Sequence, residues 1–225
     1  MSVLGVDACK AGWVGVRLGD DLLPSAFCGR TIDDLVRLAG AVDVVAIDIP
    51  IGLPDGEARK ADSLARLAIG PRRSSVFSTP ARSALVATTH AEATAISVAL
   101  TGMGLSQQAY ALGPKILEVD EWVRRTSTQV VEVHPEVSFA TLAGRPLTEP
   151  KKTWAGFMLR RRLLSDAGIH LADDLGLVGV AVDADDVLDA AVAAWSALRV
   201  AKGEHISLPH PAETMPDGYA AAIVA

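Results

Sequence analysis

Two short apolar runs, each closed by an aspartate, constrain the fold of this chain more than any other feature of its sequence. The first is VLGVD at residues 3–7 and the second is VDVVAID at 42–48. Unbroken apolar runs of this length are typical of strands buried on both faces, as in a parallel sheet covered by helices. We therefore predict an α/β fold in which Asp7 and Asp48 stand at the ends of two buried strands.

The neighbouring patterns give these two strands an order. WVGVRL at 13–18 predicts a strand that forms a hairpin with the first run, and residues 22–28 predict a third antiparallel strand. Thr31 is a favourable cap for a helix that runs through Leu38. Three strands, a helix and a fourth strand in this order open the RNase H fold, in which the first strand lies beside the fourth and parallel to it.

A long segment, 49–128, separates the fourth strand from the next clear one, QVVEVH at 129–134. A parallel crossover needs only about a dozen residues, so the segment predicts an inserted helical cap. Its helices are expected at 62–68, 90–100, 106–112 and 116–125. Further helices are expected to start at Pro135, to run from about 152 to 167, and to run from a cap at 183 to 203. The tail (ISLP and AAAIVA) could add a terminal hairpin.

The fold prediction is therefore a single RNase H-like α/β domain spanning 1–225. Its sheet is expected to be mixed and five-stranded, with three antiparallel strands followed by parallel strands, and to be flanked by helices. The segment 49–128 is the helical insertion after the fourth strand.

Composition and charge limit the function classes. Half of the 225 residues are hydrophobic but only 4% are aromatic, so aliphatic side chains must fill the core. Two cysteines, Cys9 and Cys28, are too few for a disulfide framework. With no membrane span and no signal peptide evident, we expect a cytoplasmic protein without membrane contact. A net charge of −6 argues against passive adhesion to nucleic acid.

Basic residues are nevertheless concentrated in two segments, 57–82 and 145–165, each with six Lys or Arg. Such segments in an acidic chain suit a protein that handles a phosphate ligand. A solvated helix face is an equally good interpretation for Arg160, Arg161 and Arg162.

The two strand-end carboxylates are suited to hold a divalent cation. On neighbouring strands about 4.8 Å apart, Asp7 and Asp48 could share one ion or flank two ions about 3.5–4 Å apart. A bound cation would relieve their mutual repulsion. One strand-end Asp alone is better explained as a turn-forming residue, but the pair in this topology favours Mg²⁺ or Mn²⁺.

The last long helix supplies two more acids. Asp186 and Asp189 are three residues apart and so lie on one helix face. Asp189 lies past the first turn of an Ala-rich helix, where the helix dipole no longer favours an acid. The small residues Ala193 and Ser196 continue this face and would let it approach the sheet closely. We therefore add both acids to the predicted metal ligands.

Other polar residues are weaker candidates. Glu132 lies in an apolar strand and could be a fourth ligand or a general base. His134 shares its strand face, but a histidine at a strand end is more often a satisfied structural residue than a ligand. Asp183 and Asp185 are explained as a helix cap and a first-turn acid.

Six ordered motifs carry a resemblance to a known family. They are GVDACKAGWVGV (5–16), AIDIPIGLP (46–54), SSVFSTPAR (74–82), PKILEVD (114–120), EVHPEVSF (132–139) and DDVLDAAVAA (185–194). Together they resemble domain-of-unknown-function family four-two-nine, which is described as predicted RNase H-like nucleases, and the resemblance runs nearly end to end. It implies the RNase H fold. The spacing of the last-helix acids also resembles the Holliday-junction resolvase branch of that fold.

The leading hypothesis is a metal-dependent phosphodiester hydrolase, a predicted RNase H-like nuclease. Its catalytic carboxylates would be Asp7, Asp48, Glu132, Asp186 and Asp189, and those other than Glu132 would bind two Mg²⁺ or Mn²⁺ ions. One ion would activate water and the other would stabilise the leaving oxygen. Arg73, Ser75 and Arg82 would contact phosphates. The substrate would be a nucleic acid or a phosphorylated small molecule; the patterns leave the oligomeric state open, and a homodimer is compatible with them.

Two alternatives belong to other classes. A noncatalytic binding or assembly module could retain the fold and its carboxylates; sparse aromatics offer few base-stacking surfaces. A phosphoryl-transfer enzyme of the actin-like ATPase branch would need a Gly- and Thr-rich hairpin after the first Asp. The hairpin at 8–12 reads ACKAG instead, without a hydroxyl, which disfavours this alternative.

Overall fold

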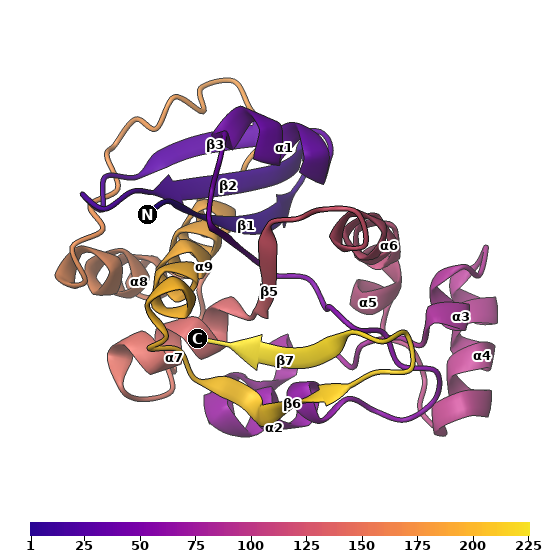
Figure 1. The fold of residues 1–225 in the computed structure, drawn as a ribbon. Helices are drawn as coiled ribbons and strands as arrows, with labels where there is room; N and C mark the ends of the chain where they lie inside the picture. The colour runs from indigo at the N-terminus through magenta and orange to yellow at the C-terminus, as the bar shows by residue number, and fades with distance from the viewer.

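The computed structural model describes residues 1–225 as one mixed sheet flanked by helices (Figure 1). Its strands are β1 Val3–Cys9, β2 Gly12–Leu18, β3 Ser25–Gly29, β4 Val44–Ile47, β5 Gln129–Val133, β6 Ser207–Thr214 and β7 Ala220–Val224. The order across the sheet is β3-β2-β1-β4-β5-β7-β6. β1, β4, β5 and β7 run parallel to one another, and the remaining pairings are antiparallel. The first and fourth strands are therefore parallel neighbours, as the sequence predicts.

The prediction of five strands is wrong, because the tail joins the sheet. β7 pairs in parallel with β5, and β6 then adds an antiparallel edge. This edge strand contains Pro209 and Pro211, which are tolerated there because an edge strand has unpaired N–H positions. The apolar tail indicates a hairpin, but its partner strand depends on where the preceding helix returns the chain.

Side chains of the two central strands alternate between two apolar layers. Odd-numbered residues of β1 and even-numbered residues of β4 face α9 (Ala184–Lys202), with α7 (Pro135–Ala143) and α8 (Trp154–Asp166) packed against that helix. The alternate residues face α1 (Ile32–Ala39) and α6 (Gly113–Val123). Because side chains alternate along a strand, Asp7 continues the α9 face of β1 and Asp48 continues that of β4.

The segment between β4 and β5 is helical, and its helices pack against different parts of the fold. It contains α2 Lys60–Ile69, the 3-10 helix η1 Gly70–Ser75, α3 Arg82–Leu85, α4 His90–Thr101, α5 Gln107–Ala111 and α6. α2 packs against β6 and β7, and α6 contacts α1. α3 and α4 lie at the far right of the ribbon, away from the central strands (Figure 1). None of the helices has the length and apolarity needed to cross a bilayer.

The strand β1 and the helix α9 pack backbone against backbone. A Cβ added at Gly5 would lie 2.0 Å from the backbone nitrogen of Ala194 and 2.1 Å from the carbonyl oxygen of Ala190. Only glycine therefore lets the helix backbone approach the strand this closely. The alanines of the helix face provide the matching surface, and the contact fixes α9 directly over the strand that ends in Asp7.

We expect Gly5→Ala to destabilise the protein by about 3 kcal/mol or more, since overpacking against backbone atoms cannot be relieved by side-chain rotation. Chemical denaturation of the variant measures this change. The matched control is Gly104→Ala, where the added Cβ would lie 3.7 Å from the nearest atom, a side-chain carbon of Thr94. Equal stabilities of the two variants would contradict the account of the β1–α9 contact.

Candidate functional site at the carboxyl edge of the sheet

Asp7 and Asp48 stand side by side at the carboxyl edge of the parallel strands. The pairing of Val6 with Ile47 places the two aspartates at the next position of neighbouring strands. The Asp48 backbone N–H donates to the Val6 carbonyl at 3.1 Å and extends the pairing by one step. The Asp7 side chain is buried, with 8% of its surface exposed. The arrangement follows directly from two apolar runs that end at the same height.

The amino-terminal end of α9 adds further acids to this edge. Asp189 is buried, with 2% exposure, and its charge acts on Asp7. Asp186 lines the same cavity, although one of its oxygens also accepts a hydrogen bond from the Asp183 backbone N–H at 3.3 Å. The structure therefore brings the two strand-end acids and the two helix acids to one region.

A cavity of about 210 Å³ opens at this edge. Its lining includes Asp7, Asp48, Asp186, Glu132, Asp62, His134, Ser75 and Lys151, together with apolar residues such as Phe77 and Leu112. Among the lining residues Lys151 is the only Lys or Arg. The cavity is therefore acidic, with one ammonium group.

Burial and mutual repulsion raise the pKa values of the carboxyls. Burial raises the pKa of Asp7 well above its ordinary value, and the charges of Asp48 and Asp189 raise it further. Burial likewise raises the pKa of Asp48 to about 7 and that of Asp189 to about 6, with Lys151 opposing both shifts. The three carboxyls thus share a region that disfavours their charge and that a cation would stabilise.

Lys151 provides the positive charge at this group of carboxyls. It lies between α7 and α8, and its Nζ donates to Asp189 Oδ2 at 2.5 Å and lies 3.3 Å from Asp185 Oδ2. Burial works to lower the pKa of Lys151, but the charges of Asp189, Asp7 and Asp185 raise it overall. Asp185 is thus more than a first-turn acid, because it helps to hold this ammonium.

Glu132 lies at the cavity but in a different environment from Asp7 and Asp48. Its pairing position is beside Ile47, on the face of the sheet opposite α9. One carboxylate oxygen accepts from Arg59 Nη2 at 2.6 Å and the other accepts from the Ile51 N–H at 2.7 Å. Burial raises the pKa of Glu132 to about 7, and Arg59 opposes this shift. The carboxylate fixes the segment that follows Asp48.

His134 lies near the cavity end of β5. Its Nε2 is 3.4 Å from the Ser75 carbonyl oxygen, and its Nδ1 is buried without a hydrogen-bond partner. Burial lowers the pKa of His134, which favours the neutral ring. The residue is therefore only partly satisfied by protein contacts.

The three residues predicted to contact phosphate have different surroundings. Ser75 lines the cavity, and its hydroxyl donates to the Arg72 carbonyl at 2.9 Å. Arg73 is exposed and is outside the ion pairs that hold Arg72 and Arg82. The Arg82 guanidinium donates to Asp120 at 2.7 and 2.9 Å.

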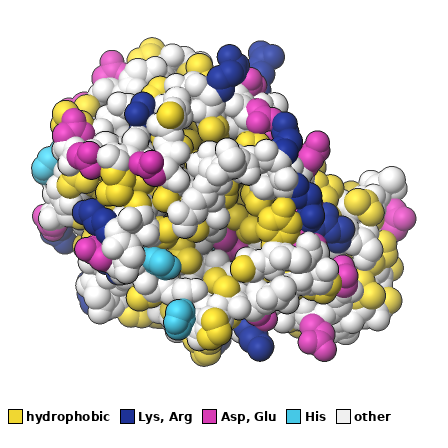
Figure 2. Space-filling model, viewed as in Figure 1, with side chains coloured by type: hydrophobic (Ala, Val, Ile, Leu, Met, Phe, Trp, Pro, Cys, Tyr) yellow, Lys and Arg dark blue, Asp and Glu magenta, His cyan; other side chains and the backbone are white.

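Arg82 also contacts Asp217 at 3.1 Å and so joins α3 to the turn between β6 and β7. Arg124 shares both acidic partners. Lys and Arg side chains gather over the region of α6 on one face of the molecule (Figure 2). Arg82 and Arg124 are therefore paired with acids rather than free to bind an anion.

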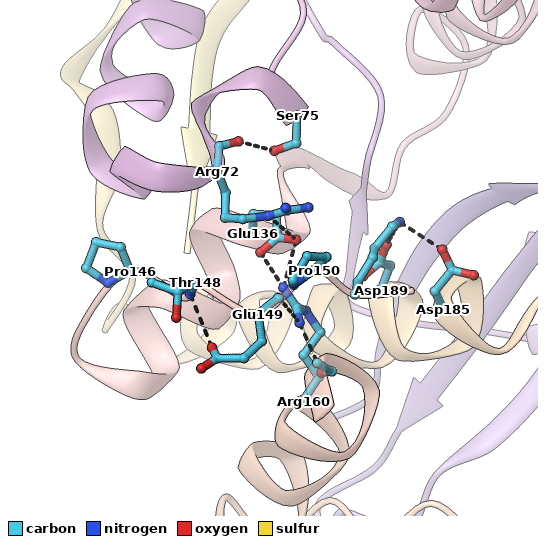
Figure 3. Close-up of polar contacts among 12 residues, drawn as sticks. Arg72, Ser75, Glu136, Pro146, Thr148, Glu149, Pro150, Arg160, Asp185 and Asp189 are labelled. Atoms are coloured by element: carbon cyan, nitrogen blue, oxygen red, sulfur yellow. Dashed lines mark hydrogen bonds and ion pairs between the residues drawn. The ribbon is translucent and has the colours of Figure 1, made fainter. Parts of the chain in front are cut away.

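Like Lys151, the buried residues Arg160 and Glu136 support the site and are not predicted from the sequence. Arg160 is fully buried and not part of a solvated helix face; its Nη2 donates to both Glu136 oxygens at 2.8 and 2.7 Å. Its Nη1 donates to the Glu149 carbonyl at 3.0 Å, close to Lys151 in the chain (Figure 3). An acid in the first turn of one helix and an Arg among other basic residues give no sequence signal of this pairing.

No group of three or more His, Cys, Asp and Glu side chains is arranged so that it could hold a metal ion. The sequence-based prediction of a four-aspartate cage therefore has no ready-made counterpart in the geometry. The oxygen donors themselves are the kind that Mg²⁺ and Mn²⁺ prefer.

The fold and this edge define an α/β protein with a carboxylate-lined cavity at the end of a parallel sheet. A family model described as protein of unknown function (DUF429) matches residues 5–214. The chain therefore belongs to the DUF429 family, as its motifs predict. No curated protein and no solved structure gives a significant match.

We expect Asp48→Asn to stabilise the metal-free protein at pH 8 by on the order of 2–4 kcal/mol. The folded-state pKa of Asp48 lies above its unfolded value, so this carboxyl costs stability as pH rises from about 4 to about 7. At pH 4 the carboxyl is protonated and the two proteins should be nearly equal. Denaturation with a chelator across this pH range measures the difference.

The control for this measurement is Asp55→Asn, which removes an exposed acid. It should change the pH dependence little. If Asp48→Asn is less stable than the parent protein at pH 8, burial does not disfavour the charged form of Asp48 as its raised pKa indicates.

Proposed function

We propose that this protein is a metal-dependent phosphodiester hydrolase with an RNase H-like fold. The architecture supports this proposal through its first five strands, in which antiparallel β1–β3 are followed by β4 and β5 parallel to β1. The proposed substrate is a nucleic acid or a phosphorylated small molecule.

One observation carries the proposal: three carboxyls with raised pKa values, the buried Asp7 and Asp189 and the half-buried Asp48, lie at one edge of the sheet. Asp7, Asp48 and Asp189 repel one another, and Lys151 is the single ammonium beside them. Buried charges of the same sign cost folding free energy when no partner of opposite charge compensates them. A cation that binds there would recover this cost, which favours a site that takes up a positive ligand.

The donor set fits a hard divalent cation even without a cage of three side chains. Mg²⁺ commonly binds through one or two carboxylates and completes its shell with water and substrate phosphate. Asp7 and Asp48 are the pair suited to this, because Asp48 accepts no hydrogen bond that would compete and Asp7 accepts only from the N–H of Ala8. A bound ion would supply charge to polarise a phosphate and to activate water.

The chain's own groups would orient the substrate around that pair. Arg73 is exposed and unpaired with acids, and Ser75 presents its side chain at the cavity wall. Arg73 can donate to phosphate oxygens, and Ser75 can do so when its hydroxyl rotates away from the Arg72 carbonyl. Glu132 and Arg59 hold the backbone that follows Asp48 and so preserve the height of its carboxylate. Arg82 does not contact phosphate in this proposal. Its ion pairs link the helical segment to the β6–β7 turn.

The proposal is tested by metal-dependent stabilisation together with hydrolysis. We expect millimolar Mg²⁺ or Mn²⁺ to raise the melting temperature, since a ligand at a hundredfold excess over its Kd adds about 2.7 kcal/mol. Phosphodiester hydrolysis should be measured on oligonucleotides and on a small chromogenic diester. Asp7→Asn should remove the metal response and lower hydrolysis by on the order of a hundredfold or more.

Asp55→Asn again serves as the matched control and should behave like the parent protein. Absence of hydrolysis on every diester with either metal would rule out the proposed activity. Cleavage that persists undiminished in Asp7→Asn would show that the activity does not arise at this site.

A further inference from the structure

The segment that carries Lys151 is built to hold its backbone in place. The Pro150 carbonyl accepts from the Thr153 N–H at 3.0 Å and from the Thr153 hydroxyl at 2.8 Å. A Cβ added at Gly156 would lie 2.0 Å from that same carbonyl oxygen, so the helix start packs directly on the segment. These contacts hold the peptide that precedes Lys151 against the start of α8.

The buried Arg160 also holds the backbone that precedes Lys151. Its guanidinium donates to the Glu149 carbonyl at 3.0 Å while both Glu136 oxygens hold its other nitrogen. Figure 3 shows Arg160 beside Glu136 and Glu149. The α9 acids Asp185 and Asp189 lie in a separate part of the same view. The Lys151 ammonium therefore contacts the α9 acids from a backbone segment that hydrogen bonds hold in place. A lysine on the surface would lack such contacts around its backbone.

The acids of the site consequently fall into two groups. Asp189 and Asp185 hold Lys151 at 2.5 and 3.3 Å, and such charge-assisted contacts occupy their oxygens. Asp7 and Asp48 have no side-chain cation partner within ion-pair distance. A two-metal site needs carboxylates on both sides of a pair of ions about 3.5–4 Å apart, and here the Lys151 ammonium already occupies the α9 side.

We propose that Lys151 is the fixed second cation of this site, so that the protein takes up one divalent ion, at Asp7 and Asp48. This inference rests on the proposed function and specifies it. Lys151 acts as a positioning residue: its ammonium neutralises Asp189 and leaves the strand-end pair to the metal. A phosphate held at the ion would then have a second positive charge beside it.

The test is the number of Mn²⁺ ions bound per chain, measured by calorimetry and by the loss of the free Mn²⁺ paramagnetic signal. We expect one ion for the parent protein and two for Lys151→Met, because the freed carboxylates of Asp189 and Asp185 then accept a second ion. Lys151→Arg keeps the charge and should bind one. Lys152→Met removes the exposed neighbouring charge and should also bind one.

Two ions in the parent protein would overturn this inference and leave the proposed function standing. One ion in both the parent protein and Lys151→Met would overturn it as well, and the parent result does not depend on how well the variant folds. No Mn²⁺ bound by the parent protein would also overturn it. The hydrolysis assay then decides separately whether the proposed activity fails too.

Discussion

The contact between Gly5 and the backbone of α9 is the constraint on which the rest of the structure depends. Because the strand has no Cβ at this position, Ala190 and Ala194 approach its backbone directly. Asp189 precedes that contact by one residue, so the packing sets how far its carboxylate reaches toward Asp7. A bulkier residue at this crossing would move the helix and separate the two acids.

Close packing in turn creates an electrostatic cost that other parts of the chain offset. Carboxyls drawn out of water repel one another more strongly than they would at the surface. Lys151 compensates Asp189, and Arg160 compensates Glu136, which itself raises the pKa of Asp48. Since breaking a buried ion pair leaves an uncompensated charge, the α7–α8 segment is as much a part of the site as the strands.

Much of this arrangement can be predicted from local patterns. The apolar runs that end in Asp7 and Asp48 indicate two neighbouring parallel strands, and the position of Asp189 beyond the first helical turn distinguishes it from a dipole-stabilised acid. The short η1 and α3 are not predicted from the sequence, whereas the four helices expected within residues 49–128 correspond to α2, α4, α5 and α6. These features are decided by residues close together in the chain, which is why the sequence reveals them.

The remaining features depend on contacts between distant segments. Lys151 and Arg160 belong to a basic run that is typical of an exposed surface, and only tertiary packing decides that one reaches the acids and the other is buried. The face of Glu132 depends on the pairing register between β4 and β5, which strand periodicity alone does not set. The addition of β7 and β6 to the sheet likewise depends on pairing between segments that are far apart in the sequence.

The central claim is that the strand-end carboxylates form a cation site beside an ammonium that the fold supplies. Anomalous diffraction from crystals grown with Mn²⁺ tests it most directly, because manganese can be located independently of the protein atoms. The account predicts one anomalous peak between the Asp7 and Asp48 carboxylates, with Lys151 still against Asp189. Crystals without a peak at this edge, or with a manganese ion in the place of the Lys151 ammonium, would contradict it.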